Sequence, residues 1–437
     1  MSEQVLPARK PFARRVAAWY EELMTQPPYP IRPMTSADLA DVVGLTSESF
    51  NSTFPVASEI ERERALWEPD RSIGAYDGSL LVGSAIGISF RMTVPGGIEP
   101  VFGVTGVAVR QTHRRRGILR SLMTRQLTGL HEAGREPVAV LGASESAIYG
   151  RYGYGCTAAE STFTLRAGES GFVPEAPADP GLRLRSAVPA EAVPELAKVF
   201  DAWLGARPGA FARDEAWWSV LVSDPEYRRH GYGPLRCVLA EDASGPRGYA
   251  LFATREADDE HGLPDGLLRV QEMFATDPAA YAAVCAHVLD RDLIRTVTVP
   301  GRPVDDPLLR LLADPRRTRA RMTDGLWARL VDVDRALAAR RYAAPAEAVI
   351  AVRDDVCPWN AGTWRLRVGT DGAECVRTDA EPDVTLPVAA LGAAYFGGTR
   401  LLSYGEAGLA TEHRPGALHA LSAAFAWEPS PWSPTEF

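Results

Sequence analysis

Apolar positions along the chain follow two periodicities, one typical of strands and one typical of helices. In the first third of the chain, strand-like runs occur at 31–34, 72–91, 101–109 and 137–141. Between the first two runs, the capping sequence from Thr35 to Asp38 precedes apolar residues at helical spacing from Leu39 to Leu45. The Asp77-Gly78 pair divides the second run and predicts a hairpin turn. Together these patterns predict a unit of mixed α and β structure.

The same order of elements returns after a break in composition. Residues 166–182 are rich in glycine, proline and acidic residues, which is typical of a linker. The next segments repeat the strand, cap and helix at 182–200, the hairpin at 237–254, and the strand followed by a helix at 268–289. This order indicates an internal repeat of one fold, detected by pattern and not by identity.

A third unit follows a second break near 314–317. Its strand-like segments lie at 348–356 and 363–378, the latter divided by Asp371-Gly372, and a helix-rich end runs from 386 to 426. The expected organisation is an N-terminal extension at 1–28, a first unit at 29–166, a second at 183–322 and a third at 323–437. The expected fold class is α+β, that is, mixed α/β.

Composition narrows the possible partners. The chain has 437 residues with a net charge of −9, which argues against nucleic acid as the main partner and suits a cationic amine. Apolar runs of membrane-spanning or signal-peptide length do not occur, so we expect neither a membrane span nor a secretory leader. The five cysteines are scattered and form no CxxC pair, which predicts reduced thiols in the cytoplasm and no zinc site. No other metal site is expected.

The strongest chemical signal is a strand, an arginine-rich turn and a helix within residues 107–120. The strand ends at Val109, the turn ends at Gly117, and an amphipathic helix begins directly afterwards. A helix N-terminus offers free backbone N–H groups to an anion, and a glycine there lets a phosphate approach the backbone. The arginines add charge and forked donors. This segment therefore predicts a diphosphate site.

Two motifs resemble a known family. Arg114-Arg115-Arg116-Gly117 resembles the acetyl-CoA motif of the GNAT acetyltransferases, with Leu119 in place of the second small residue. Residues 143–155, ASESAIYGRYGYG, resemble a signature of the enhanced intracellular survival (Eis) branch, and the ending Glu436-Phe437 also fits. The resemblance covers about residues 30–437. It implies tandem GNAT folds followed by a domain like sterol carrier protein, a homohexamer, and acetyl-CoA as acetyl donor for an N-acetyltransferase.

The resemblance also assigns roles in binding acetyl-CoA. The backbone at the strand end would hold the pantetheine, and the turn and helix start would hold the diphosphate. Ser144 and Glu145 would flank the thiol end. The implied cofactor-binding residues are Val107, Ala108, Val109, Arg115, Arg116, Gly117, Ile118, Leu119, Arg120, Ser144 and Glu145.

The family's catalytic groups map onto Tyr149 and Phe437. Tyr149 would protonate the leaving thiolate, and its ordinary pKa of about 10 suits a thiol of about 8–9. Tyr152 and Tyr154 are neighbours that could compete for this role. The terminal carboxylate of Phe437 would act as general base, although a carboxylate is a weak base unless it is desolvated or acts through a water. Direct transfer is expected, since Cys156 lies in a glycine-rich turn without a histidine beside it.

For the acceptor amine, the family positions are Phe50, Trp67 and Glu436. Aromatic walls and a carboxylate suit a cationic small molecule such as an aminoglycoside, a polyamine or a lysine-type amine. Family members that acetylate aminoglycosides carry an acidic residue where this chain has Ser52, a departure that weighs against that substrate. The alternatives are a protein-lysine acetyltransferase and a non-catalytic protein that senses acetyl-CoA or binds an apolar ligand.

The second unit lacks the phosphate motif. Its corresponding segment, 272–278, has no arginine run and no glycine, and Asp277 would repel a phosphate. We therefore expect one acetyl-CoA per chain, bound by the first unit.

Overall fold

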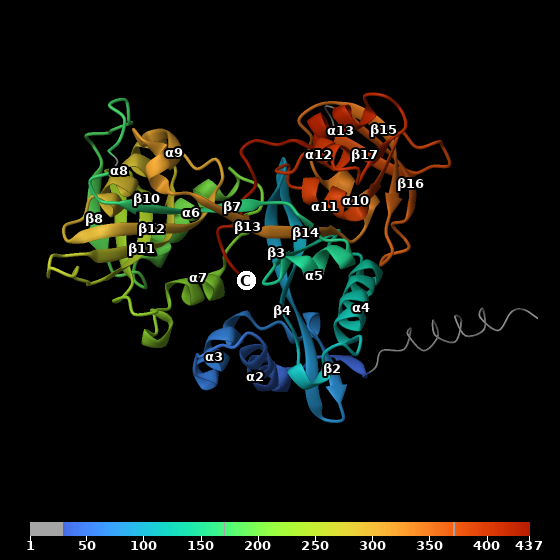
Figure 1. Cartoon of the computed structure of the whole chain (residues 1–437), viewed down its shortest axis with the longest axis horizontal. Helices are drawn as coiled ribbons and strands as arrows, with labels where there is room; N and C mark the ends of the chain where they lie inside the picture. Colours follow the sequence, from blue (N-terminus) through green and yellow to red (C-terminus); the bar gives the residue numbers. More distant parts are fainter. Residues whose placement is uncertain (1–28, 170, 370–371) are drawn as a thin grey trace, which may run out of the picture.

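The computed structural model describes residues 29–169, 171–369 and 372–437 and contains three mixed sheets (Figure 1). The expected extension at 1–28, and Asp371 of the expected turn, lie outside these residues. The α+β architecture is confirmed, with two units of one kind followed by a third of another.

The first sheet has seven strands in the order β1-β2-β3-β4-β5-β14-β6. Its strands are β1 Ile31–Pro33, β2 Ile73–Asp77, β3 Leu80–Val94, β4 Gly97–Val109, β5 Val138–Gly142, β14 Leu326–Leu330 and β6 Gly155–Cys156. Its helices are α2 Leu39–Ser49, α3 Val56–Glu63, α4 Ile118–Ala133 and α5 Ser146–Tyr149. Helix α4 packs closely on β3, because a Cβ at Gly83 would lie 2.6 Å from Cγ2 of Ile118. This close approach fixes the start of α4 beside the end of β4.

The second sheet has seven strands in the order β13-β7-β12-β11-β10-β9-β8. Its strands are β13 Arg321–Asp324, β7 Ala159–Arg166, β12 Ile294–Pro303, β11 Gly266–Ala275, β10 Gly245–Arg255, β9 Arg236–Asp242 and β8 Arg183–Ala187. Its helices are α6 Val193–Leu204, α7 Glu215–Val222, α8 Pro278–Leu289 and α9 Leu308–Leu311. As in the first sheet, an antiparallel meander is followed by a parallel pair, β11 with β12, joined through a helix. This agrees with the expected repeat.

The two sheets exchange strands across the expected boundaries at 166 and 323. Strand β7, expected at the end of the first unit, pairs with β12 and β13 of the second sheet. Strand β14, expected in the third unit, returns to the first sheet between β5 and β6. Strands of this length carry an apolar pattern but no local signal for their partner, so only tertiary packing decides the pairing.

The third unit packs helices against a five-stranded sheet. Its strands are β15 Ala346–Arg353, β16 Gly362–Gly369, β17 Gly372–Arg377, β18 Val384–Pro387 and β19 Thr411–Glu412, and its helices are α10 Val333–Ala339, α11 Val388–Ala394, α12 Leu401–Glu406 and α13 Ala417–Phe425. Fully buried side chains, including Tyr395, Phe396 and Phe425, fill the space between the layers. The buried guanidinium of Arg340 donates to the carbonyls of Ala394, Tyr395 and Phe425.

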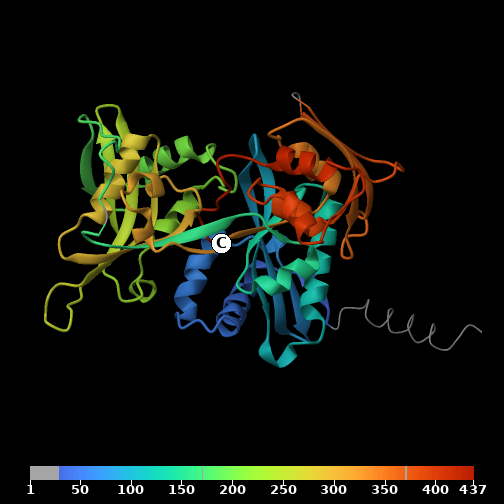
Figure 2. The same ribbon diagram turned by 45° about the horizontal axis from the view of Figure 1, so that its top comes forward.

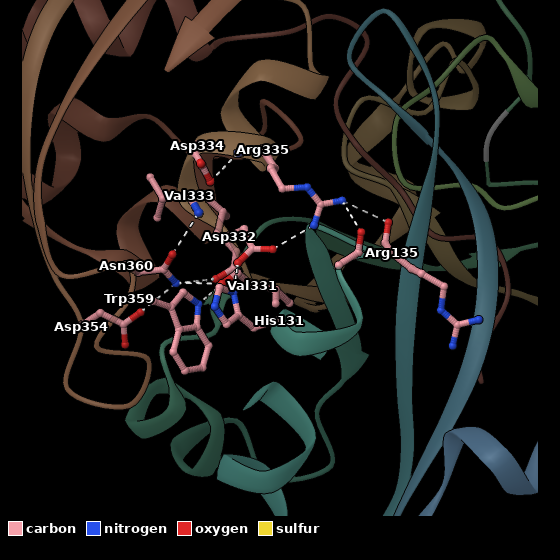
Figure 3. A network of polar contacts seen from close by, with 12 residues as sticks. His131, Arg135, Val331, Asp332, Val333, Asp334, Arg335, Asp354, Trp359 and Asn360 are labelled. Carbon is pink, nitrogen blue, oxygen red and sulfur yellow. Dashed lines mark hydrogen bonds and ion pairs between the residues drawn. The ribbon is translucent and has the colours of Figure 1, made fainter. Parts of the chain in front are cut away.

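A polar network joins the end of α4 to the third unit (Figure 3). The ring of His131 stacks on Trp359 at 4.3 Å, and its Nδ1 lies 2.5 Å from Oδ1 of Asp332. Arg335 bridges Asp332 and the carbonyl of Gly134, at 2.9 and 2.8 Å. The first and third units are therefore held together at the C-terminal end of α4.

After α13 the chain turns back and ends between the first and second sheets, where both views place the C-terminus (Figure 1 and Figure 2). Over the described parts of the chain, no helix has the length and apolar character needed to cross a bilayer. Within the same residues, His, Cys, Asp and Glu side chains form no group of three or more that could hold a metal ion.

Candidate active site

A cleft opens where β4 and β5 separate. The two strands pair in parallel at Phe102–Ala139 and Gly103–Val140. Beyond these pairs β4 continues to Val109 and β5 to Gly142. The end of β4 can therefore offer backbone groups to a bound molecule. The cleft measures about 540 Å³, within the usual range for cofactor sites.

A β-bulge shapes the β4 wall of this cleft. Ser84 faces Ala108 but Ile86 faces Thr105, so one residue of β3 lies opposite two of β4. Gly106 has a φ of +52°, and the Ser84 hydroxyl donates to its carbonyl at 2.7 Å. The bulge reorients the strand end, and Val107, Ala108 and Val109 line the cleft as expected.

The arginine turn and the start of α4 form the second wall. Gly117 is the N-cap of α4 and has a φ of +80°, where only glycine is unstrained. Arg115 also has a left-handed φ, +63°, and strain of this kind is concentrated at ligand sites. The cleft is lined here by Arg114, Arg115, Gly117, Ile118, Leu119 and Arg120. The free N–H groups of α4, the arginines and the missing Cβ suit a diphosphate.

Arg116 differs from the expectation. Its guanidinium donates to the hydroxyl of Tyr29 at 2.6 Å and to the carbonyl of Thr112 at 3.1 Å, and these contacts direct it away from the cleft. Arg114, which did not enter the predicted set, lines the cleft instead. Arg114 is the first residue of the motif, so the sequence contained the signal for it.

Tyr149 closes α5 and lines the same cleft beside Ser144, Glu145 and Tyr152. Its side chain is mostly buried, and burial together with the charge of Glu145 raises the pKa of Tyr149 to about 12. The phenol is therefore protonated at neutral pH, as a general acid must be. Tyr154 is only 1% exposed and lies in the core behind Tyr149, which removes it from direct contact with a substrate.

Phe437 lies in a neighbouring pocket. Its ring packs on Phe90 and Phe211, with centroid distances of 4.7 and 6.1 Å. Phe437 and Glu436 line a pocket of about 270 Å³ together with Ser144, which also lines the acetyl-CoA cleft. Tyr149 and Phe437 thus line two different cavities that share Ser144 as a wall residue.

Comparisons with known proteins agree with this geometry. Residues 30–157 and 209–341 each match a family described as acetyltransferase (GNAT) domain, and residues 333–434 match a sterol carrier protein domain. The chain is 32% identical to N-acetyltransferase Eis of Mycobacterium tuberculosis over 360 residues, which cover 81% of this chain and 85% of that protein. The chain belongs to the Eis family of GNAT N-acetyltransferases.

Other relatives and solved structures support the same assignment. An uncharacterized N-acetyltransferase of Streptomyces avermitilis is 45% identical over 88% of this chain and 94% of its own length. The crystal structure of Eis1 from Mycobacterium abscessus matches with a TM-score of 0.79 at 32% identity, covering 93% of this chain and all of that one. A GCN5-related N-acetyltransferase from Anabaena variabilis shares the fold, with a TM-score of 0.78 at 20% identity over 94% of this chain and 100% of that one.

Membership in the Eis family makes this chain an acyltransferase that uses acetyl-CoA as acetyl donor. The cleft between β4, β5 and α4 has the features that this donor requires: a free strand end for the pantetheine and a cationic helix start for the diphosphate.

The three residues expected to contact the acceptor do not share one cavity. Phe50 is half exposed and lines the acetyl-CoA cleft. Trp67 packs against the apolar cluster of Leu45, Tyr76 and Ile86, and its buried Nε1 has no hydrogen-bond partner in the part of the chain that the structure describes. Glu436 lines the pocket of Phe437 and a second pocket of about 360 Å³.

This second pocket was not foreseen from the sequence. It lies among α3, α7, the second sheet and the C-terminal residues, and its charged residues include Arg62, Arg228, Arg269 and Glu436. Arg228 is already paired with Glu59. Both signs of charge are present, so the pocket is mixed in character and not the uniformly acidic surface that a polycation would favour. Residues from all three units build it, which explains why no single sequence motif predicts it.

Glu160 was also missed. It lines the pocket of Phe437, and burial raises the pKa of Glu160, with a further contribution from the carboxylates of Glu436 and Asp324. Its strand, β7, joins the second sheet through the strand exchange, so its neighbours could not be inferred locally.

In the second unit the corresponding helix is α8, and the N–H groups at its start are already hydrogen-bonded within the protein. Oδ1 of Asp277 accepts hydrogen bonds from the N–H groups of Ala279 and Ala280 at 3.0 Å, and Oδ2 accepts from Nε of Arg247 at 2.9 Å. The corresponding groups, which in the first unit are expected to bind a diphosphate, are here satisfied by the protein itself. This supports the expectation of one acetyl-CoA per chain, which stays a prediction.

Proposed function

We propose that this Eis-family enzyme transfers the acetyl group of acetyl-CoA directly to the amine of a small cationic molecule, such as a polyamine, a lysine-type amine or an aminoglycoside-like amine. The observation that supports this most is that Ser144 lines two cavities, one of which is also lined by Tyr149 and the other by Phe437. In this proposal, the protonated phenol of Tyr149 and the carboxylate of Phe437 act on one reaction site beside Ser144.

In the proposed mechanism, the terminal carboxylate of Phe437 takes a proton from the acceptor ammonium, directly or through a water. The free amine nitrogen attacks the thioester carbon, and backbone N–H groups of Val107 to Val109 stabilise the negative charge on the carbonyl oxygen. The carbon–sulfur bond breaks, and the phenol of Tyr149 gives its proton to the departing thiolate. The products are the N-acetylated amine and CoA.

The mixed charge of the pocket beside Glu436 favours an acceptor with one or two amines over a strongly polycationic aminoglycoside. The identity of residue 52 also weighs against an aminoglycoside. Relatives that acetylate aminoglycosides carry an acidic residue at this position, whereas this chain has Ser52. A protein-lysine acceptor is the second form of the same chemistry. The rival apolar-ligand protein finds little support, because fully buried side chains and Arg340 fill the interior of the third unit.

The test is CoA release from acetyl-CoA across polyamines, arylalkylamines, lysine peptides and aminoglycosides. We expect amine-dependent release, greatest with small mono- or diamines. Folded protein that binds acetyl-CoA by calorimetry, yet releases no CoA with any amine, would favour the non-catalytic alternative.

We also propose a cytoplasmic homohexamer. The family resemblance suggests the hexamer, and the five cysteines, all of them unpaired thiols in the structure, are consistent with a reducing compartment. Sedimentation equilibrium gives the subunit number, and any assembly other than six chains would refute that part.

A further inference from the structure

The second unit has kept the cleft of its fold but not the phosphate site. Strands β11 and β12 pair in parallel only from Gly266 to Arg269, and beyond that they separate as β4 and β5 do. The resulting cleft of about 230 Å³ is lined by residues of both strand ends and by Trp203 of α6. A further wall comes from Trp432, which belongs to the C-terminal segment and not to this unit.

Trp432 is held there by several contacts. Its side chain is 4% exposed, and its Nε1 donates to the carbonyl of Gly301 at 2.6 Å. The indole packs on Phe274 and Trp203, with centroid distances of 5.7 and 5.6 Å, and the guanidinium of Arg302 lies over it at 4.7 Å. An aromatic ring therefore occupies part of the cleft that corresponds to the acetyl-CoA cleft of the first unit.

The backbone beside Trp432 is fixed as well. Its N–H donates to the carbonyl of Pro208 at 2.8 Å. Gly209, with a φ of +100°, lets this backbone pass, because a Cβ there would lie 2.8 Å from the carbonyl oxygen of Trp432. Two residues earlier, the N–H of Ser430 donates to Asp305 at 2.9 Å.

A buried arginine holds the chain again three residues later. Nη2 of Arg213 donates to the hydroxyl of Thr435 at 2.6 Å. Arg213 is fully buried as a side chain and is fixed by both carboxylate oxygens of Glu272, which also accepts from the hydroxyl of Tyr249 at 2.6 Å. Phe437 lies two residues beyond Thr435, so the Cα atoms of these two residues can be at most about 7 Å apart.

We propose that the second unit serves as a clamp for the C-terminus, with Trp432 in its former ligand cleft and Arg213 on Thr435, and that this clamp keeps Glu436 and Phe437 at the reaction site. Thr435 is a positioning residue that acts through the last two residues. The inference rests on the proposed function, because it assigns the base to that terminus. It gives the second unit a part in catalysis without a second acetyl-CoA.

The test compares four full-length proteins: Thr435→Val, Thr435→Ser, an addition of two glycines after Phe437, and the addition combined with Thr435→Val. Thr318→Val is the matched control, since Thr318 is also buried, in the second unit, and its hydroxyl donates to the carbonyl of Pro315. We expect Thr435→Val to lower kcat about 10- to 100-fold with little change in the KM for acetyl-CoA, because a small displacement of a reacting group costs that much. Thr435→Ser restores kcat, and Thr318→Val leaves it unchanged.

The combined variant shows whether Thr435 acts through the terminus. Groups that act as a unit give non-additive losses, so the combined variant should be no slower than the glycine addition alone. Faster hydrogen exchange of residues 430–437 in Thr435→Val is expected, at an unchanged melting temperature. Losses that multiply, or a folded Thr435→Val protein with kcat within twofold of the parent, would overturn the clamp.

The clamp and the base assignment can fail separately. If the glycine addition alone leaves kcat intact, the terminal carboxylate is not the base, and the clamp is then decided by Thr435→Val alone. If Thr435→Val proves unstable, Trp432→Phe replaces it, because phenylalanine keeps a ring in the cleft but loses the hydrogen bond to Gly301. The same fall in kcat at unchanged KM is expected, and its absence refutes the proposal.

Discussion

Replacing Tyr149 by phenylalanine removes one oxygen atom and tests the proposed general acid. That oxygen makes no hydrogen bond with the residues that the structure describes, so its loss should change the free energy of unfolding by less than about 0.5 kcal/mol. Loss of a general acid lowers kcat by roughly 10²- to 10⁴-fold. A thiolate leaves more easily than an alkoxide, so we expect the lower end, about 10²-fold, which is about 2.7 kcal/mol of activation free energy.

The assay is steady-state CoA release with the preferred amine, combined with acetyl-CoA affinity from calorimetry and a melting curve. The pH dependence of kcat is a second test of the acid role. Because the pKa of Tyr149 is raised to about 12, the phenol stays protonated between pH 7 and 10, and kcat should not fall with rising pH in that window. A phenol at its ordinary pKa of about 10 would lose activity there.

Tyr154→Phe is the matched control. Tyr154 lies beside Tyr149 with a ring distance of 6.0 Å, but among the described residues its buried hydroxyl has no hydrogen-bond partner, and Tyr154 does not line the cleft. We expect unchanged kcat and equal or slightly greater stability, since an unsatisfied buried hydroxyl costs about 1 kcal/mol or more. A Tyr149→Phe protein that keeps at least half of the parent kcat refutes the acid role, and equal losses in both variants would indicate a packing effect.

Three further predictions concern the acetyl-CoA cleft. Arg114→Ala should raise the KM for acetyl-CoA about tenfold, since a charged hydrogen bond to phosphate is lost. Arg116→Ala should change this KM less than twofold, because Arg116 is hydrogen-bonded to Tyr29 and Thr112. A larger effect of Arg116→Ala than of Arg114→Ala would contradict the geometry. Gly117→Ala should raise the same KM and destabilise the fold by about 1–2 kcal/mol, measured by urea unfolding, because its φ of +80° is strained for alanine. Calorimetric titration should give one acetyl-CoA per chain, and a stoichiometry of two would show that Asp277 does not close the second site.

The sequence was most informative where structure and chemistry lie in one continuous segment. The strand end, the turn and the helix start between Val107 and Arg120 are contiguous, so their geometry follows from local rules for strands, caps and glycine. The family resemblance added Ser144, Glu145 and Tyr149, and the structure places all three on the same cleft.

Contacts between distant parts of the chain could not be predicted. The Arg213–Thr435 hydrogen bond joins residues 222 positions apart, and no local sequence pattern around either residue predicts it. Arg116 is turned by Tyr29, which is 87 positions away. Trp67 has the right residue type for an amine pocket, yet packing against Leu45 and Tyr76 decides its place. Residue type and spacing specify what a side chain can do, while tertiary packing determines which partner it meets.

The strand exchange has a consequence for how the units cooperate. Strand β14 lies between β5 and β6 of the first sheet, and Leu326, Ala328 and Leu330 on it are buried in the core. The sheet that carries the acetyl-CoA cleft is therefore complete only after the chain has passed through the second unit. The path to Phe437 then runs through the third unit, which is attached to the end of α4, and back into the cleft of the second. In the proposed clamp, the second unit therefore contributes to one reaction site in two ways: β14, which follows it in the chain, completes the first sheet, and its cleft positions the last residues.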